Sequence, residues 1–166
     1  NDDIAKLRDI DKLTQGRYRS QVLDITYPAA QGASGCVTAL QTLCNAADKA
    51  VAEGFNVLIL SDRTVSAERV VIPALVACSK VHLHLVQAGL RTSTGLVVDT
   101  GSAREVHHFA LLAGYGAEAV CPWLAYETIT NMKLPANVDG KEAKKRFIKA
   151  INKGLMKVMS KMGIST

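Results

Sequence analysis

The sequence predicts an α/β protein in which an open parallel sheet carries helices on both faces. Three short apolar runs support this prediction, and each ends at polar residues or a proline: Val57–Leu60, Gly95–Val98 and Ala117–Cys121. Segments with helical periodicity lie between them, and such alternation is typical of βαβ units. Nearly continuous apolar strands suit a sheet that is covered on both faces.

The bulk composition favours a single domain over 1–166. A chain of 166 residues can bury a sizeable core, and 48% hydrophobic with 21% charged residues is typical of globular proteins. No apolar run approaches the roughly 18 residues that cross a bilayer, so no membrane contact is expected. No signal peptide is visible after Asn1, and a cytoplasmic location is expected. The missing initiator methionine suggests a processed chain or one cut from something longer.

The first half of the chain predicts a helix, a strand and a second helix. Apolar residues at steps of three within 1–20 suggest a short helix that Gly16 would end. A strand at 22–26 stops at Tyr27-Pro28, and 32–35 form a small-residue loop before a helix over 36–53. The apolar stripe of that helix is Val37, Leu40, Leu43 or Cys44, Ala47 and Val51.

The next units follow the same order. A strand at 56–60 precedes a helix over 72–89, with Pro73 in its first turn. The expected buried stripe of this helix is Leu75, Val76, Ser79, His82 or Leu83, and Val86. After a strand at 95–99, Ser102 and Glu105 have the spacing of a capping box. They predict a helix over 103–113 that carries Val106, Phe109, Ala110 and Ala113 inward.

The last part is a strand at 117–121, a helix at 122–132, a loop at 135–140 and a long helix at 141–162. Eight basic residues and one acidic residue give the C-terminal segment a charge of +7, so the rest of the chain carries −2 of the net +5. The only aromatic residue there is Phe147, on the apolar stripe, so a solvated lysine face is expected and no nucleic-acid partner. The basic residues are Lys141, Lys144, Lys145, Arg146, Lys149, Lys153, Lys157 and Lys161.

Catalytic and metal-binding signatures are missing. There is no Walker loop, GxGxxG, GxSxG or HExxH motif. His82 and His84 are two apart and point away from each other, and His107 and His108 form no liganding pattern. The cysteines form no CxxC pair and are expected to be buried, reduced thiols: Cys36, Cys44, Cys78 and Cys121. The sequence therefore predicts no catalytic, cofactor-binding or metal-binding residue.

Two stretches remain open as anion sites. Ser61-Asp62-Arg63 follows a strand, at the end where open α/β sheets place ligand groups. Gly32–Gly35 precedes a helix whose amides could cradle an anion. A simple turn is the alternative in both places, and it is the favoured interpretation because fold position alone is weak support for a site.

Six strings, in order along the chain, resemble the central domain of the large chain of glutamate synthase. The resemblance runs from about Leu23 to the last residue. The strings are Leu23–Pro28, Leu58–Arg63, Ser102–Phe109, Gly114–Pro122, Leu124–Thr128 and Ser160–Thr166.

The resemblance implies a multidomain parent enzyme. An amidotransferase domain releases ammonia from glutamine, and the ammonia passes through a tunnel to an FMN-binding barrel. There 2-oxoglutarate becomes glutamate with electrons from an iron–sulfur cluster. The central domain lies between these sites and is itself open α/β, similar to part of a (β/α) barrel. FMN and the cluster therefore belong to the parent, while 1–166 would hold none and 141–166 would lead to the FMN domain.

Two functions follow as hypotheses. The first is a linking central domain that is catalytically silent alone, with the amidotransferase and FMN-binding domains as its partners. The alternative is a free-standing flavodoxin-like module that binds a small anion at Ser61–Arg63 and the Gly32 loop. In the first case the apolar end of the last helix would lack its natural partner, so self-association or fraying is expected. That end comprises Val158, Met159, Met162 and Ile164.

Overall fold

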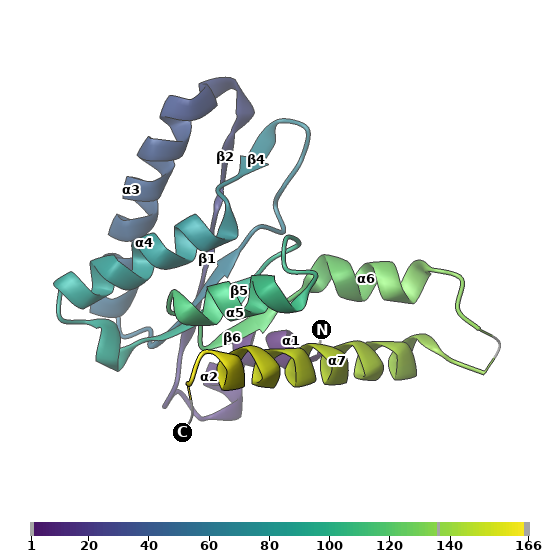
Figure 1. The fold of residues 1–166 in the computed structure, drawn as a ribbon. Helices are drawn as coiled ribbons and strands as arrows, with labels where there is room; N and C mark the ends of the chain where they lie inside the picture. Colours follow the sequence, from purple (N-terminus) through teal and green to yellow (C-terminus); the bar gives the residue numbers. More distant parts are fainter. Residues whose placement is uncertain (1, 136, 165–166) are drawn as a thin grey trace.

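The computed structural model describes residues 2–135 and 137–164 (Figure 1). Its centre is a four-stranded sheet in the order β1–β3–β5–β6. All pairings in this sheet are parallel, which confirms the predicted topology. The strands are β1 (Ser20–Asp24), β3 (Val57–Ser61), β5 (Gly95–Asp99) and β6 (Ala119–Cys121).

Helices alternate with these strands. The α-helices are α1 (Asp2–Arg8), α2 (Ile10–Leu13), α3 (Gly32–Ala52), α4 (Ala74–Gln87), α5 (Val106–Gly114), α6 (Trp123–Asn131) and α7 (Gly140–Lys161). Short 3₁₀ turns, η1 (Ala29–Gln31) and η2 (Arg91–Ser93), precede α3 and β5. The loop expected at 135–140 lies between α6 and α7, and α7 already begins at Gly140.

Both faces of the sheet are covered, as the apolar strands predict. Alternate strand residues point to opposite faces. Leu58, Leu60 and Val98 join the main core with α3, α4 and α5. Ile59 and Val97 point the other way and pack against Ile4 of α1. The N-terminal helix thus covers the face that the longer helices leave open.

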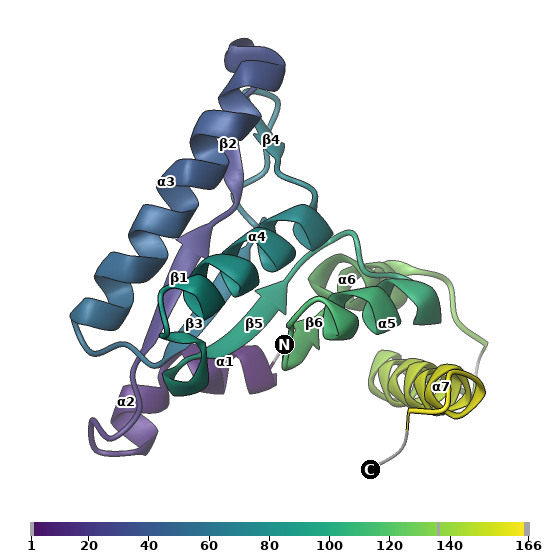
Figure 2. The same cartoon turned by 60° about the vertical axis from the view of Figure 1, so that its left-hand side comes forward.

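A small antiparallel ribbon extends the chain beyond β1. β2 (Thr26–Pro28) pairs with β4 (Arg69–Val71), so the stop expected at Tyr27-Pro28 is wrong. The backbone stays extended because Arg69 donates to the Thr26 carbonyl oxygen at 2.9 Å and to its hydroxyl at 2.8 Å. Figure 2 shows this ribbon rising from the sheet beside the start of α3.

The helical stripes agree with the predicted ones only in part: Leu43, Cys44 and Ala47 of α3 are buried as expected. In α4 the buried residues are Ala74, Ala77, Cys78, Val81 and Leu85. Val76 and Val86 are exposed instead, because the smaller side chains let α4 pack closely against the sheet and α3. Val37 of α3 is likewise exposed, at 71%.

The expected loop at 32–35 is the first turn of α3. Gly35 is buried there, and a Cβ at this position would lie 2.9 Å from the Gln31 side-chain oxygen and 3.1 Å from the Tyr27 ring. The small residues therefore serve a close approach at the start of the helix.

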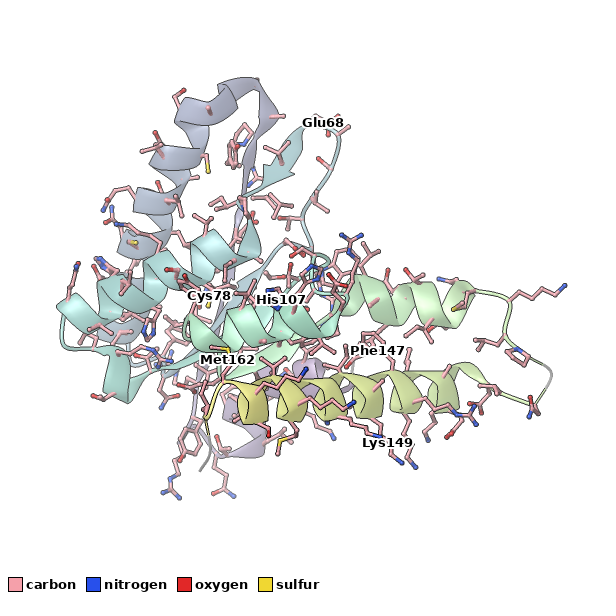
Figure 3. The ribbon with its side chains drawn as sticks, viewed as in Figure 1. Glu68, Cys78, His107, Phe147, Lys149 and Met162 are labelled. Atoms are coloured by element: carbon pink, nitrogen blue, oxygen red, sulfur yellow. The ribbon has the colours of Figure 1, made fainter. Side chains whose placement is uncertain are left out.

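The last helix packs on α5 and α6 and runs along them at the margin of the molecule (Figures 1 and 2). In its apolar row, Phe147 meets Tyr126 of α6 edge-to-face, with 6.1 Å between ring centroids. Figure 3 shows Phe147 on the inner side of α7 and Lys149 on the outer side. Met162 and Ile164 are exposed, while Val158 and Met159 are half-buried.

Candidate functional site

Polar side chains gather where the parallel strands end. Asp24, Ser61, Asp99 and Cys121 are the last residues of β1, β3, β5 and β6. Because parallel strands end at the same edge, these residues lie along one side of the sheet, where α/β proteins usually bind ligands. Whether this edge can bind a ligand depends on which of its groups are free.

Asp99 is the centre of the edge. Its side chain is fully buried, and Arg63 bonds it through both nitrogens, Nε to Oδ2 at 2.7 Å and Nη2 to Oδ1 at 3.1 Å. Arg8 of α1 donates to Oδ2 at 2.9 Å, and the Ser61 hydroxyl donates at 3.2 Å. The hydrogen bond to Asp99 raises the pKa of Arg63. Both carboxylate oxygens are thus occupied, and the two arginines tie α1 to β3 and β5.

Asp62 is a second centre and is 3% exposed. Trp123 of α6 donates its indole N–H to Oδ1 at 2.6 Å, and the Thr100 hydroxyl donates to Oδ2 at 2.6 Å. The Gly101 amide bonds both oxygens. The Arg63 guanidinium lies 5.2 Å from the centre of the Trp123 ring, within range of a cation–π contact. Asp62 therefore fixes both the start of α6 and the turn after β5.

We call these residues the carboxyl-end network: Arg8, Ser61, Asp62, Arg63, Asp99, Thr100 and Trp123. The sequence singled out Ser61, Asp62 and Arg63, and the structure does bring them together at the sheet edge. The sequence analysis missed Arg8, Thr100 and Trp123. Their partners are far away in the chain, and only the strand register brings them together.

Asp24 has its own set of donors. The amide and hydroxyl of Thr26 and the hydroxyl of Thr64 donate to Oδ1 at 2.7–2.8 Å, and Arg69 donates to Oδ2 at 3.0 Å. Partial burial pushes the pKa of Asp24 up, but the hydrogen bonds from Thr64 and Thr26 and the charge of Arg69 outweigh it, so the pKa is lowered.

This lowered pKa predicts a pH dependence. A carboxyl group whose pKa is lower in the folded state stabilises the fold above its unfolded pKa, and the effect is lost as pH falls through the folded pKa. We expect the free energy of unfolding to fall less steeply below about pH 4 in Asp24→Asn and in Thr64→Val. Urea unfolding at several pH values measures this. Thr128→Val is the control, because its hydroxyl bonds only the Leu124 carbonyl oxygen. Parallel profiles for all variants would contradict the prediction.

The capping box predicted at Ser102 is wrong. Helix α5 begins at Val106, and Glu105 is in the N-cap position without a side-chain cap bond. Ser102 cannot begin the helix because its amide donates to the Thr100 hydroxyl at 3.1 Å, within the turn that Asp62 holds. The ring of His108 accepts from the Arg104 amide at 3.2 Å instead.

The chemistry available at this edge is limited. Burial raises the pKa of Cys121 to about 11, so its thiol is protonated and is a weak nucleophile at neutral pH. His84 pairs with Asp48 at 2.8 Å, and the ring of His82 accepts from Arg91 at 3.0 Å. These two histidines therefore have separate protein partners. Within 2–135 and 137–164, no group of three or more His, Cys, Asp or Glu residues could hold a metal ion.

The thiols follow the sequence prediction in part. All four cysteines are free, and Cys44 and Cys78 are buried. Cys36 and Cys121 are only half-buried. Burial also raises the pKa of Cys78 to about 11.

Among the described residues, none of the helices combines the length and the apolar character that crossing a bilayer requires.

A family comparison matches residues 1–166 to the glutamate synthase central domain. The NADH-dependent glutamate synthase of Schizosaccharomyces pombe is 42% identical over 169 residues, covering 99% of this chain and 8% of the relative. Ferredoxin-dependent glutamate synthase 2 of Arabidopsis thaliana is 44% identical, covering 89% of this chain and 10% of its own. The large chain of the NADPH-dependent glutamate synthase of Bacillus subtilis is 46% identical, and the match covers 76% of this chain and 8% of that relative. The chain thus spans 8–10% of the length of these relatives.

Solved structures show the same architecture. A mutant flavocytochrome b2 with pyruvate bound superposes with a TM-score of 0.58 at 16% identity, covering 93% of this chain and 33% of that chain. The part of flavocytochrome b2 that matches belongs to a TIM barrel. This supports the predicted fold class, an open parallel sheet like part of a (β/α) barrel.

Proposed function

This chain belongs to the glutamate synthase central domain family, and from that premise we propose that it links the other domains of a glutamate synthase. In this proposal 1–166 forms one structural unit between the glutamine amidotransferase and FMN-binding domains, with α7 leading toward the latter. The parent transfers the amide nitrogen of glutamine to 2-oxoglutarate to give glutamate. The predicted cytoplasmic location stays a prediction.

The observation that carries the proposal is the occupancy of the carboxyl-end network. Groups that would bind a substrate or a flavin phosphate there already have protein partners. Arg63 is bonded to Asp99, and the Gly101 amide is bonded to Asp62. An edge bonded in this way stabilises the fold and keeps its two buried carboxylates, Asp62 and Asp99, engaged with protein donors, so we assign no catalytic residue to this chain.

We assign the cofactors to other domains on the same argument. A flavin phosphate is held by amide and guanidinium donors, and here the Gly101 amide bonds Asp62 while Arg63 is held by Asp99. Relatives named for NADH, ferredoxin and NADPH match at 42–46% identity, which is consistent with a domain that does not contact the electron donor. We propose that FMN and the iron–sulfur cluster belong to other domains of the parent.

The alternative function, a free-standing module for small anions, is not favoured. Its two candidate stretches were Ser61–Arg63 and Gly32–Gly35. In the structure the first is bonded to Asp99, and the second forms the packed first turn of α3. Neither leaves an open cradle for an anion.

The test measures, in the complete parent enzyme, how much ammonia escapes to solution for each glutamate formed, and compares wild type with variants. We expect Asp99→Asn to raise the ammonia released to solution per glutamate formed at least twofold, because a loosened central domain no longer holds the two catalytic domains in place. The flavin spectrum and the initial rate of glutamine hydrolysis should stay unchanged. Glu118→Gln is the control, because it removes a more exposed carboxylate that pairs with Arg91.

Two outcomes would contradict this function. One is unchanged coupling in an Asp99→Asn enzyme whose central domain is measurably destabilised. The other concerns the chain 1–166 purified alone, which is expected to be colourless and to form no glutamate from glutamine and 2-oxoglutarate. Flavin absorbance or turnover by this chain would place the chemistry here.

A further inference from the structure

Strand β6 forms one end of the sheet and pairs only with β5. The Thr100 amide donates to the Cys121 carbonyl oxygen, so the Cys121 backbone faces β5. Because successive residues of a strand face opposite sides, the N–H and C=O of the preceding Val120 face the open edge. Val120 is paired with Val98, which fits this register. Among the described residues, no side chain hydrogen-bonds to the β6 backbone at that edge.

At the opposite end of the sheet, one outward-facing carbonyl oxygen of β1 has a side-chain partner. The Val57 amide donates to the Arg19 carbonyl oxygen, so the Arg19 carbonyl faces β3. Backbone groups of successive residues face alternate sides, so the N–H and C=O of Val22 face away from β3. The Gln21 side chain donates to the Val22 carbonyl oxygen at 3.3 Å. Native proteins blunt edge strands in this manner to avoid unwanted pairing. Among the described residues no such bond reaches β6, so β6 is the more open of the two edges.

Two apolar cavities flank β6. One of about 260 Å³ lies toward the main core, between β6, α5, α6 and α7, and its lining includes Phe109, Val120, Tyr126, Ile151 and Leu155. The other, of about 190 Å³, lies toward α1. Its lining is mainly apolar, with Ile4, Leu7, Val97, Cys121 and Ile148, and it also includes the charged residues Asp3 and Lys144. An apolar cavity of about 150 Å³ can hold a benzene molecule, so each has room for an apolar side chain.

The two cavities have the geometry that an added strand requires. Consecutive side chains of a strand point to opposite faces of the sheet. A strand beside β6 would therefore place neighbouring side chains alternately in the two cavities. The occupant would have to be apolar on both sides, like β3 and β5, whose residues are buried on both faces.

We propose that β6 pairs with an extended apolar segment of the parent glutamate synthase chain, added in parallel register. This inference rests on the proposed function, because it takes the occupant from the parent polypeptide. The relatives are far longer than this chain, so further chain is at hand. The open sheet resembles part of a (β/α) barrel, and in a closed barrel each strand pairs on both sides.

A second copy of this chain fits the edge less well. Helix α7 lies beside both cavities, and the segment 141–166 carries a charge of +7. Two copies paired through β6 would bring two such helices near each other, and like charges would oppose the contact.

Hydrogen exchange at residues 117–122 in the complete parent enzyme tests this inference. We expect exchange there at least tenfold slower than in the chain 1–166 alone, because pairing protects the Val120 amide. Ile148 lines both cavities flanking β6, so Ile148→Lys should restore fast exchange in the parent. Met156→Lys is the matched control on the same helix, at an exposed position outside both cavities, and should leave exchange slow.

The outcomes separate the occupants. Equal exchange rates in the parent and in the chain alone would overturn the pairing, as would equal effects of the two lysine variants in the parent. Protection that appears in the chain alone with rising concentration would assign the edge to a second copy. These readouts are independent of ammonia release, so the pairing can fail while the linking function holds, and the reverse.

Discussion

Asp99→Asn is expected to lower the free energy of unfolding by about 3 kcal/mol, because removing one partner of a buried ion pair leaves the others uncompensated. Asparagine keeps the shape of the side chain but removes its charge. Arg63 and Arg8 both bond this carboxylate, and the Arg63 bond is bidentate. Their side chains are 27% and 38% exposed, so they partly regain water and the loss stays at the low end of the usual range.

Urea unfolding of wild type and variant measures this loss. Glu118→Gln is the control, because Glu118 pairs with Arg91 but its side chain is 58% exposed. An exposed ion pair of this kind is worth less than about 1 kcal/mol. A loss for Asp99→Asn as small as that of the control would mean that the carboxyl-end network does not stabilise the fold.

The same residues show which features of the sheet edge could be predicted from the sequence. The apolar runs before Ser61 and Asp99 predict their strands correctly, since continuous apolar strands between helices have few other solutions. The polar residues that follow were placed at the right edge. Their partners were not predictable, because Arg8 reaches Asp99 across a sequence separation of 91 and Trp123 reaches Asp62 across 61. Only the register of the folded sheet brings such groups together.

The helix errors arise where contacts in the folded chain outweigh a local pattern. Helical periodicity located the helices but ranked bulky apolar residues above small ones, so it chose Val76 over Ala77 in α4. Close packing against a sheet favours the small residue at such a contact. At Ser102 a valid capping pattern lost to a competing turn, because Thr100 accepts the Ser102 amide. In α4 the packing of the helix overrode a correct local preference, and at Ser102 a turn that Asp62 holds did so.

The last helix offers a test of the same conflict between local preference and packing. Gly154 lies inside α7, where alanine is preferred over glycine by about 1 kcal/mol. On that basis alone, Gly154→Ala would stabilise the protein. However, a Cβ at Gly154 would collide with both methyl groups of Val106 in α5, and it would lie 2.9 Å from Cγ1. We therefore expect a net loss of about 1–3 kcal/mol, the usual cost of overpacking.

A double-mutant cycle separates the two effects. In a Val106→Ala background the collision is relieved, so Gly154→Ala should become neutral or stabilising. Gly114→Ala is a control at the end of α5, where an added Cβ meets no atom within 4 Å and should cost nothing. Thermal unfolding of the four cycle members gives the coupling. If Gly154→Ala had the same effect in both backgrounds, α7 would not rest on Val106.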